Sequence, residues 1–149
     1  MGLDMYLTKK VYIGANYEHN KVTGSINIKQ GDTPIVIRLN KVVEITEEMG
    51  YWRKANAIHN WFVKNVQKGE DDCKEYYVSK DQLIKLLRTV KDVISDHSKA
   101  EELLPTTSGF FFGGTEYDEY YFDDLTNTEK IIEKALNEPN GNYYYHSSW

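Results

Sequence analysis

The sequence is poor in the residues that cross-link a chain, restrict its backbone or anchor it in a membrane: it has one cysteine, three prolines and no long apolar run. A lone Cys73 excludes an intramolecular disulfide and a zinc site built on several thiolates. No stretch approaches the roughly eighteen apolar residues of a membrane-spanning helix, and Asp4 stands where a secretory signal is basic or apolar. We therefore expect a cytoplasmic protein without a membrane partner, because a reducing compartment suits a single free thiol.

An excess of basic residues is also missing. The formal net charge is −5, and it is divided unevenly along the chain. Residues 1–67 carry nine Lys and Arg against six acids, whereas residues 68–149 carry nine against seventeen. A protein that coats nucleic acid has a basic surface, so this balance argues against direct nucleic-acid coating. The acids form either a solvated surface or a surface for a basic partner.

Aromatic residues, by contrast, are abundant. Twelve Tyr, five Phe and three Trp make up 13% of the 149 residues. Each buried ring removes a large apolar area from water, so a chain of this length can build a sizeable core from few side chains. The length fits one domain over residues 1–149, and no internal repeat or linker divides it.

The N-terminal part of the chain has the pattern of β-structure. Apolar and polar residues alternate over 3–8, which predicts a half-buried strand. Residues 25–29 and 35–39 flank a turn-like Gly-Asp-Thr-Pro and predict a hairpin. The aromatic ending at 143–149 predicts a last strand that docks beside residues 3–8.

Helical periodicity dominates the rest. Apolar residues recur at helical spacing from Trp52 to Val66 and again after Ser79, where Ser79 and Gln82 have capping-box spacing. A third helix is predicted from Thr115, as its N-cap, to residue 136. Together these elements predict an α+β fold: an antiparallel sheet, built from the N-terminal strands and the C-terminal strand, covered by about three helices.

The densest set of functional residue types lies in the first predicted helix. Helical spacing from Trp52 places Trp52, Asn56 and His59 on neighbouring turns of one face. Trp would stack on a ligand, Asn and His would hydrogen-bond to it, and Arg53 would meet an anion. The alternative interpretation is structural: this helix buries Phe62 and keeps His59 at the edge of the core.

His59 is the best candidate for a catalytic base among the four histidines, because imidazole titrates near neutrality. The acids at 70–72 and Cys73 lie one loop away and could supply its partner or a nucleophile. No spacing defines a hydrolase motif, and no His-x-x-x-His pair predicts a metal. The identity of any catalytic residue therefore stays open, and we expect neither a metal nor a cofactor.

The glycine-rich segment 108–115 has two interpretations. It could cradle a phosphate at a helix start, but it lacks the Lys and the spacing of a P-loop, and acids follow it at once. We interpret it as a tight turn that lets three Phe pack before the helix that Thr115 caps.

A second candidate surface follows directly. Residues 116–124 consist of five acids and four aromatic residues. They form either a solvated helix face or an acidic surface that docks a basic patch of another protein, even a patch that normally holds nucleic acid. The candidate binding residues here are Glu116, Asp118, Glu119, Tyr120, Asp123 and Asp124.

Several strings resemble small bacteriophage- and prophage-encoded proteins. They are the opening Met1–Leu7, Gly-Tyr-Trp-Arg-Lys-Ala-Asn at 50–56, Gly-Phe-Phe-Phe-Gly-Gly-Thr at 109–115 and Tyr-Tyr-Tyr-His-Ser-Ser-Trp at 143–149. The resemblance spans most of the chain but brings no established activity, so it assigns no catalytic role. It implies expression inside a bacterium and favours a role in phage–host conflict.

From these observations we predict an intracellular, phage-type binding protein that contacts and modulates a host protein with a basic surface, in a defence or nucleic-acid-handling system. The alternative is a small enzyme, or a protein that sequesters a nucleotide-like ligand, centred on His59 and Arg53. The sequence does not decide between the two surfaces, and it leaves the oligomeric state open, including a homodimer.

Overall fold

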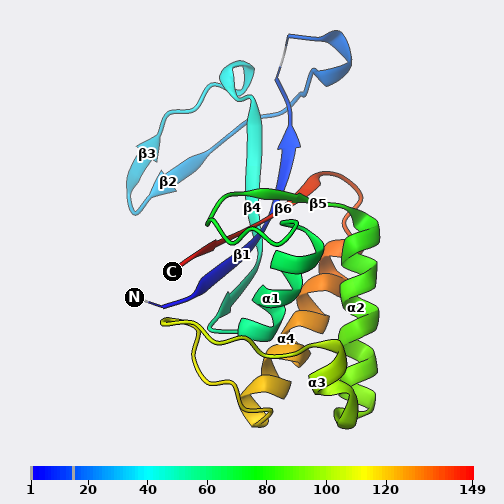
Figure 1. Cartoon of the computed structure of the whole chain (residues 1–149). Helices are drawn as coiled ribbons and strands as arrows, with labels where there is room; N and C mark the ends of the chain where they lie inside the picture. Colours follow the sequence, from blue (N-terminus) through cyan, green and yellow to red (C-terminus); the bar gives the residue numbers. More distant parts are fainter. Residues whose placement is uncertain (1, 15) are drawn as a thin grey trace.

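The computed structural model describes residues 2–14 and 16–149, which contain helices and strands in a mixed order (Figure 1). The elements are β1 (Asp4–Tyr12), β2 (Ile28–Gln30), β3 (Thr33–Ile35), β4 (Glu44–Arg53), α1 (Asn56–Asn65), β5 (Tyr76–Val78), α2 (Lys80–Ser95), α3 (Ala100–Leu103), α4 (Glu119–Leu136) and β6 (Asn142–Ser148). The predicted α+β class is therefore confirmed.

Four strands form an antiparallel sheet in the order β4-β1-β6-β5. The N-terminal strand β1 is central, and Asp4 lies opposite Arg53 of β4 on one side and Ser148 of β6 on the other. The predicted docking of the aromatic ending beside residues 3–8 is thus confirmed. Buried Met5 and Leu7 alternate with half-buried side chains, as the sequence pattern predicts.

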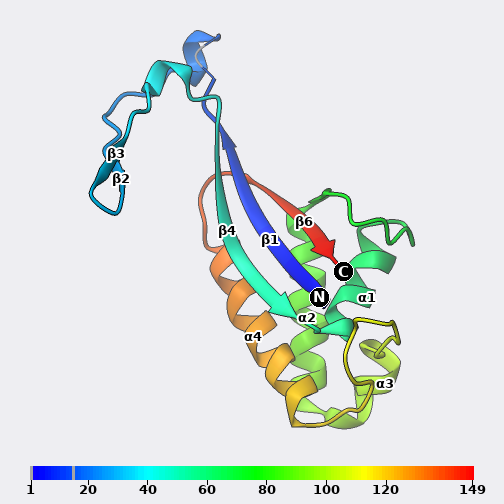
Figure 2. The ribbon, with the colours of Figure 1, turned by 90° about the vertical axis from the view of Figure 1, so that its left-hand side faces the viewer.

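The long helices α1, α2 and α4 cover one face of this sheet (Figures 1 and 2). The core lies between the two layers. The ring of Phe62 on α1 stacks on Tyr145 of β6, with ring centroids 3.9 Å apart. At the start of α2, Ser79 and Gln82 form both hydrogen bonds of the predicted capping box. Among the described residues, no helix is long and apolar enough to cross a membrane.

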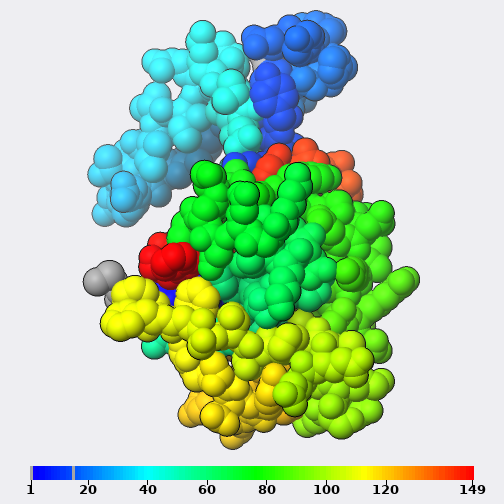
Figure 3. All heavy atoms as spheres, viewed as in Figure 1, coloured from blue at the N-terminus to red at the C-terminus, as the bar shows by residue number. Residues whose placement is uncertain are grey.

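A hairpin forms in the predicted region, with shorter strands and a turn at 31–32 only, but it does not join the main sheet. Strands β2 and β3 are three residues each and pair only with each other. They belong to residues 16–43, which we call the arm, and the arm stands apart from the rest of the molecule (Figures 2 and 3). From the sequence we expected the N-terminal strands to form the sheet together, but β4 and β6 occupy the two positions beside β1.

The predicted helix start at Trp52 is wrong. Trp52 and Arg53 are the last residues of β4, where they pair with Met5 and Asp4, and α1 begins only at Asn56. The strand continues because β1 supplies backbone partners up to this point, and pairing with a neighbouring strand outweighs local helical periodicity. The side chains of Trp52 and Arg53 consequently point to opposite faces, one buried and one exposed.

Candidate functional site: a pocket between the β4–α1 turn and α4

The turn between β4 and α1 is built on a strained residue. Lys54 has a φ of 59°, in the left-handed region that side chains other than glycine rarely adopt. Its N–H donates to the carbonyl of Leu3 at 2.7 Å, and its carbonyl accepts from the N–H of Asn56 at 2.8 Å. These bonds hold the conformation and direct the chain from the sheet edge into α1. Strain of this kind often marks a functional site.

Asn56 fastens the glycine-rich loop to the first turn of α1. Its side-chain amide donates to the carbonyls of Phe112, at 3.0 Å, and Gly114, at 2.7 Å. Its side-chain oxygen accepts from the N–H of Thr107 at 3.0 Å. Three of the four hydrogen-bonding positions of the Asn56 side chain are therefore occupied. Asn56 is buried and acts as a latch rather than as a free ligand contact.

Two further hydrogen bonds hold the segment between α3 and α4. Tyr121 donates from its hydroxyl group to the carbonyl of Leu104 at 2.9 Å. The carbonyl of Thr115 accepts from the hydroxyl group of Thr106 at 3.0 Å. Thr115 is thereby held in the loop, and the prediction that it caps the helix is wrong. Asp118 is the N-cap instead, and its carboxylate accepts from the N–H of Tyr121.

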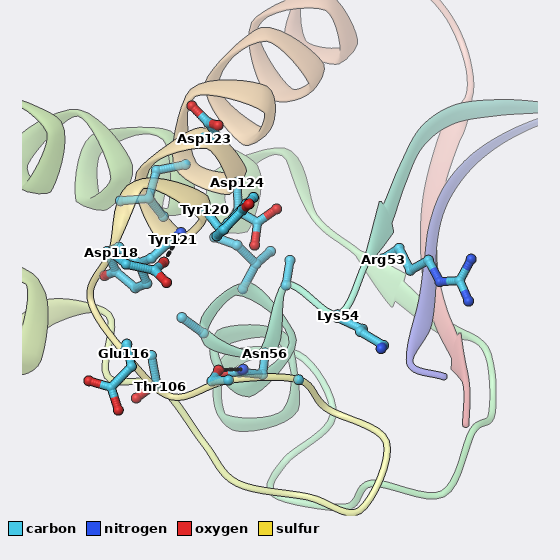
Figure 4. A pocket seen from close by; sticks show the side chains of 16 residues that line it. Arg53, Lys54, Asn56, Thr106, Glu116, Asp118, Tyr120, Tyr121, Asp123 and Asp124 are labelled. Carbon is cyan, nitrogen blue, oxygen red and sulfur yellow. Dashed lines mark hydrogen bonds between the residues drawn. The ribbon is translucent and has the colours of Figure 1, made fainter. Parts of the chain in front are cut away.

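A pocket of about 350 Å³ lies where these segments meet (Figure 4). Its walls are the turn from Arg53 to Ile58, the loop around Gly113 and the first turns of α4. Residues from both of the surfaces that the sequence presents as competitors line this one pocket. Seven of the ten predicted site residues contribute to it: Arg53, Asn56, Glu116, Asp118, Tyr120, Asp123 and Asp124.

The pocket is dominated by negative charge on one side. We call Glu116, Asp118, Tyr120, Asp123 and Asp124 the acidic wall. The charged ends of Arg53 and Lys54 lie at the opposite rim and point away from the acidic wall (Figure 4). Within residues 2–14 and 16–149, no side-chain carboxylate of the acidic wall forms an ion pair. The wall therefore presents unneutralised charge to an incoming group.

Asp124 is the carboxylate most affected by this arrangement. Partial burial raises the pKa of Asp124 to about 6, and the neighbouring charges of Asp123 and Asp118 act in the same direction. Burial also raises the pKa of the adjacent Tyr121 well above its ordinary value, so this phenol stays protonated. A cation placed beside Asp124 would favour its ionised form.

His59 lies outside this pocket, in a closed network of hydrogen bonds. Its side chain is 1% exposed, with Nδ1 2.7 Å from the hydroxyl oxygen of Tyr145 and Nε2 2.9 Å from a carboxylate oxygen of Asp71. An ionised carboxylate only accepts, so Nε2 carries a proton and donates to Asp71. In the neutral ring, Nδ1 then accepts from Tyr145, whose pKa burial raises well above its ordinary value.

This network explains the sequence pattern around His59 without catalysis. Asp71, one of the acids predicted to fold back onto His59, is its partner, whereas Cys73 is exposed and makes no hydrogen bond to it. The indole N–H of Trp149 donates to the second oxygen of Asp71 at 3.2 Å. With both ring nitrogens occupied and the ring buried, His59 has no free atom to offer a substrate in this arrangement.

The remaining predicted residues have other roles. Trp52 is buried, and its indole N–H donates to Thr128 at 2.8 Å, so it cannot stack on a ligand. Glu119 lies in the first turn of α4 but does not line the pocket. Of the three phenylalanines predicted to pack, Phe112 is buried, whereas Phe110 is 95% exposed.

Sequence reasoning missed part of the site. Lys54, Thr106 and the pair Gly113–Gly114 line the pocket but were not predicted as site residues. One signal was available, because Lys54 and the glycines belong to the strings Tyr-Trp-Arg-Lys-Ala-Asn and Gly-Phe-Phe-Phe-Gly-Gly-Thr. Gly113 has a φ of 84°, and a side chain there would crowd the Cβ of Lys54. The two strings therefore meet at this pocket.

Comparisons of the chain with protein-family models, with curated proteins and with solved structures return no match.

Proposed function

We propose that the protein binds a partner protein through this pocket, and that the acidic wall receives a basic side chain of that partner. The observation that carries the proposal is that four carboxylates, none of which forms an ion pair among the described residues, line one side of a pocket of about 350 Å³. Small-molecule sites span roughly 300–1,000 Å³, so this pocket fits one long side chain or a small ligand.

The chemistry of the wall favours a guanidinium or ammonium group. A planar guanidinium can bond to two carboxylate oxygens at once, and both cations neutralise the wall. Tyr120 is 79% exposed at the same wall and offers an aromatic face to the stem of such a side chain. A phosphate, as in the nucleotide-like alternative, would instead meet four negative charges. Nothing in the geometry of His59 offsets this, because His59 does not line the pocket.

The cellular setting is part of the proposal and rests on the sequence. The resemblance to phage and prophage proteins supports a partner in the bacterial cytoplasm. A host protein of a defence or nucleic-acid-handling system has the basic surface that an acidic pocket selects. Binding to such a surface would modulate the host protein by covering residues that it uses for nucleic acid.

The test is affinity capture from bacterial lysate, followed by a binding measurement with the purified partner. The pocket variant is Glu116→Lys with Asp123→Lys, since both residues are exposed and line the pocket. The control is Glu101→Lys with Glu102→Lys, which makes the same charge change at exposed positions of α3. We expect the wild type and the control to retain one partner with a basic surface, and the pocket variant to lose it.

Salt provides a second criterion. Affinity should fall as the salt concentration rises from about 0.05 M to about 0.5 M, because the Debye length shortens from above 10 Å to below 5 Å. A partner that the pocket variant binds as tightly as the wild type at low salt would refute the proposal. So would equal loss of binding in the control, since that result would assign the effect to net charge alone.

A further inference from the structure

The arm has no core of its own. None of its residues, 16–43, is buried, and its two strands contribute only three residue pairs. An isolated two-stranded hairpin is at best marginally stable in water. The arm also exposes seven large hydrophobic side chains, nearly half of the fifteen exposed along the described chain. Figure 3 shows this segment as a separate projection. Its exposed apolar surface indicates that another surface covers it.

The charge of the arm indicates what kind of surface that is. It contains four basic residues and two acids, in a chain whose net charge is −5. Lys21 pairs with Glu18 inside the arm. Among the described residues, Lys29, Arg38 and Lys41 form no ion pair. These cations lie among apolar side chains such as Val36, which is 79% exposed. The arm therefore fits a surface that is both acidic and aromatic.

The chain itself carries such a surface. Between Pro105 and Asp124 there are five acids and no basic residue. The acidic wall combines unpaired carboxylates with the exposed ring of Tyr120. In the structure the arm stands away from the first turns of α4, which carry most of the acidic wall (Figure 2). A second copy of the protein therefore offers the basic arm a surface of opposite charge.

We propose that the protein forms a dimer in which the arm of each copy docks on the acidic wall of the other. Arg38 enters the pocket, and apolar residues of the arm cover Tyr120. The proposal rests on the proposed function, because the same wall receives the basic group. It adds a form of regulation: the dimer covers its own pocket, so an external basic partner binds only after displacing an arm.

The first experiment measures oligomeric state by native mass spectrometry and light scattering on the full-length protein. We expect the wild type at twice the monomer mass of 17.4 kDa. The arm variant, Arg38→Glu with Lys41→Glu, and the wall variant, Glu116→Lys with Asp123→Lys, should each weaken association by at least about tenfold. The control, Lys64→Glu with Arg88→Glu, changes charge at exposed positions of α1 and α2 and should remain dimeric.

The decisive experiment mixes the two variants. In a heterodimer, the wild-type arm of the wall variant meets the wild-type wall of the arm variant, and the reversed arm meets the reversed wall. Mixing should therefore restore a dimer that contains one copy of each variant. An arm-to-arm contact would leave the wall variant dimeric on its own, and a wall-to-wall contact would leave the arm variant dimeric, so the loss of both homodimers followed by rescue is specific to the exchange of arms.

The outcomes separate this inference from the proposed function. A wild type that is monomeric at all concentrations, or a dimer that the arm variant leaves intact, overturns the arm-exchange dimer. The arm variant keeps its wall, so it should bind the external partner at least as tightly as the wild type. Suppose that the arm variant dimerises with the wall variant as expected, but that neither the arm variant nor the wild type binds a basic partner. The proposed function then fails, and the arm-exchange dimer stands. Circular dichroism melting confirms that each variant folds.

Discussion

The molecule contains two polar centres that lie close together and behave in opposite ways. Around His59, donors and acceptors are matched: Tyr145 and Asp71 occupy both ring nitrogens, and Trp149 adds a bond from the surface. In the acidic wall, four carboxylates line one side of a pocket, and none of them forms an ion pair among the described residues. The first centre is rich in residues associated with catalysis, yet it is closed. The second has none of those signatures, yet it is open.

The difference shows that residue type alone does not identify a site. A buried polar group that has partners stabilises the fold, whereas removing one partner leaves the other unsatisfied. A half-exposed charge without a partner destabilises the free protein and is relieved by a ligand. The two centres should therefore respond in opposite directions to substitution, and three predictions test this contrast.

The largest effect is expected at the closed centre. His59→Ala removes a buried ring, its two hydrogen bonds and its edge contact with Phe112, at a centroid distance of 5.1 Å. We expect the free energy of unfolding to fall by about 3–4 kcal/mol, measured by chemical denaturation. His19→Ala, at an exposed position of the arm, should change it by less than about 0.5 kcal/mol. A variant as stable as the wild type would show that the His59 network is not structural.

A smaller effect is expected at the latch between the two centres. Asn56→Ala deletes three hydrogen bonds to the glycine-rich loop and should lower the free energy of unfolding by about 2–3 kcal/mol. Partner binding should weaken as well, because the loop forms one wall of the pocket. The matched control is Asn127→Ala, at an exposed position of α4. Unchanged hydrogen exchange in the loop of the Asn56 variant would contradict its role as a latch.

The smallest effect is expected at Asp124, where substitution should raise the free energy of unfolding rather than lower it. The pKa of Asp124 is about 6 in the folded protein, above its ordinary value of 3.8. Between these values the native state binds more protons than the unfolded state, so this residue lowers wild-type stability as pH rises from 4 to 6. Asp124→Asn removes that effect and should raise the free energy of unfolding at pH 7 by about 1–2 kcal/mol, after allowance for partial exposure.

Two measurements check this prediction. The gain in stability from Asp124→Asn should vanish towards pH 4, where the wild-type carboxyl group is protonated in the folded protein. Asp123→Asn, at an exposed position on the same helix, should change stability by less than about 0.5 kcal/mol. Equal stability of wild type and Asp124→Asn at pH 7 would show that the acidic wall is not strained.

Much of the fold was predictable because its signals are local. Alternation over residues 3–8, the capping box at Ser79 and the aromatic ending each determine one element from neighbouring residues. The end of β4 was not predictable in this way, because Trp52 and Arg53 are strand residues only through pairing with Met5 and Asp4, nearly fifty positions away. Local periodicity favoured a helix, and the distant strand determined the outcome.

The sequence identified many residues of the site but not their arrangement in space. Both candidate surfaces were found, yet their union in one pocket depends on the hydrogen bond from Asn56 to Gly114, which spans 58 positions. The closed environment of His59 could not be read from the sequence for a related reason. The sequence could not show that Tyr145 and Asp71, from β6 and a loop, occupy both nitrogens. Contacts between residues so far apart in the sequence depend on how the strands pair in the sheet, and local residue spacing does not reveal them.

The central position of β1 has a consequence for how the chain is made. Strand β1 pairs with β6, and about 130 residues separate Tyr12 from Asn142. At roughly 5–20 residues per second, a ribosome delivers β6 on the order of ten seconds after β1. Until then, one edge of β1 stays open to pairing with other nascent chains. We therefore expect the yield of folded protein to depend on translation speed and on holding chaperones.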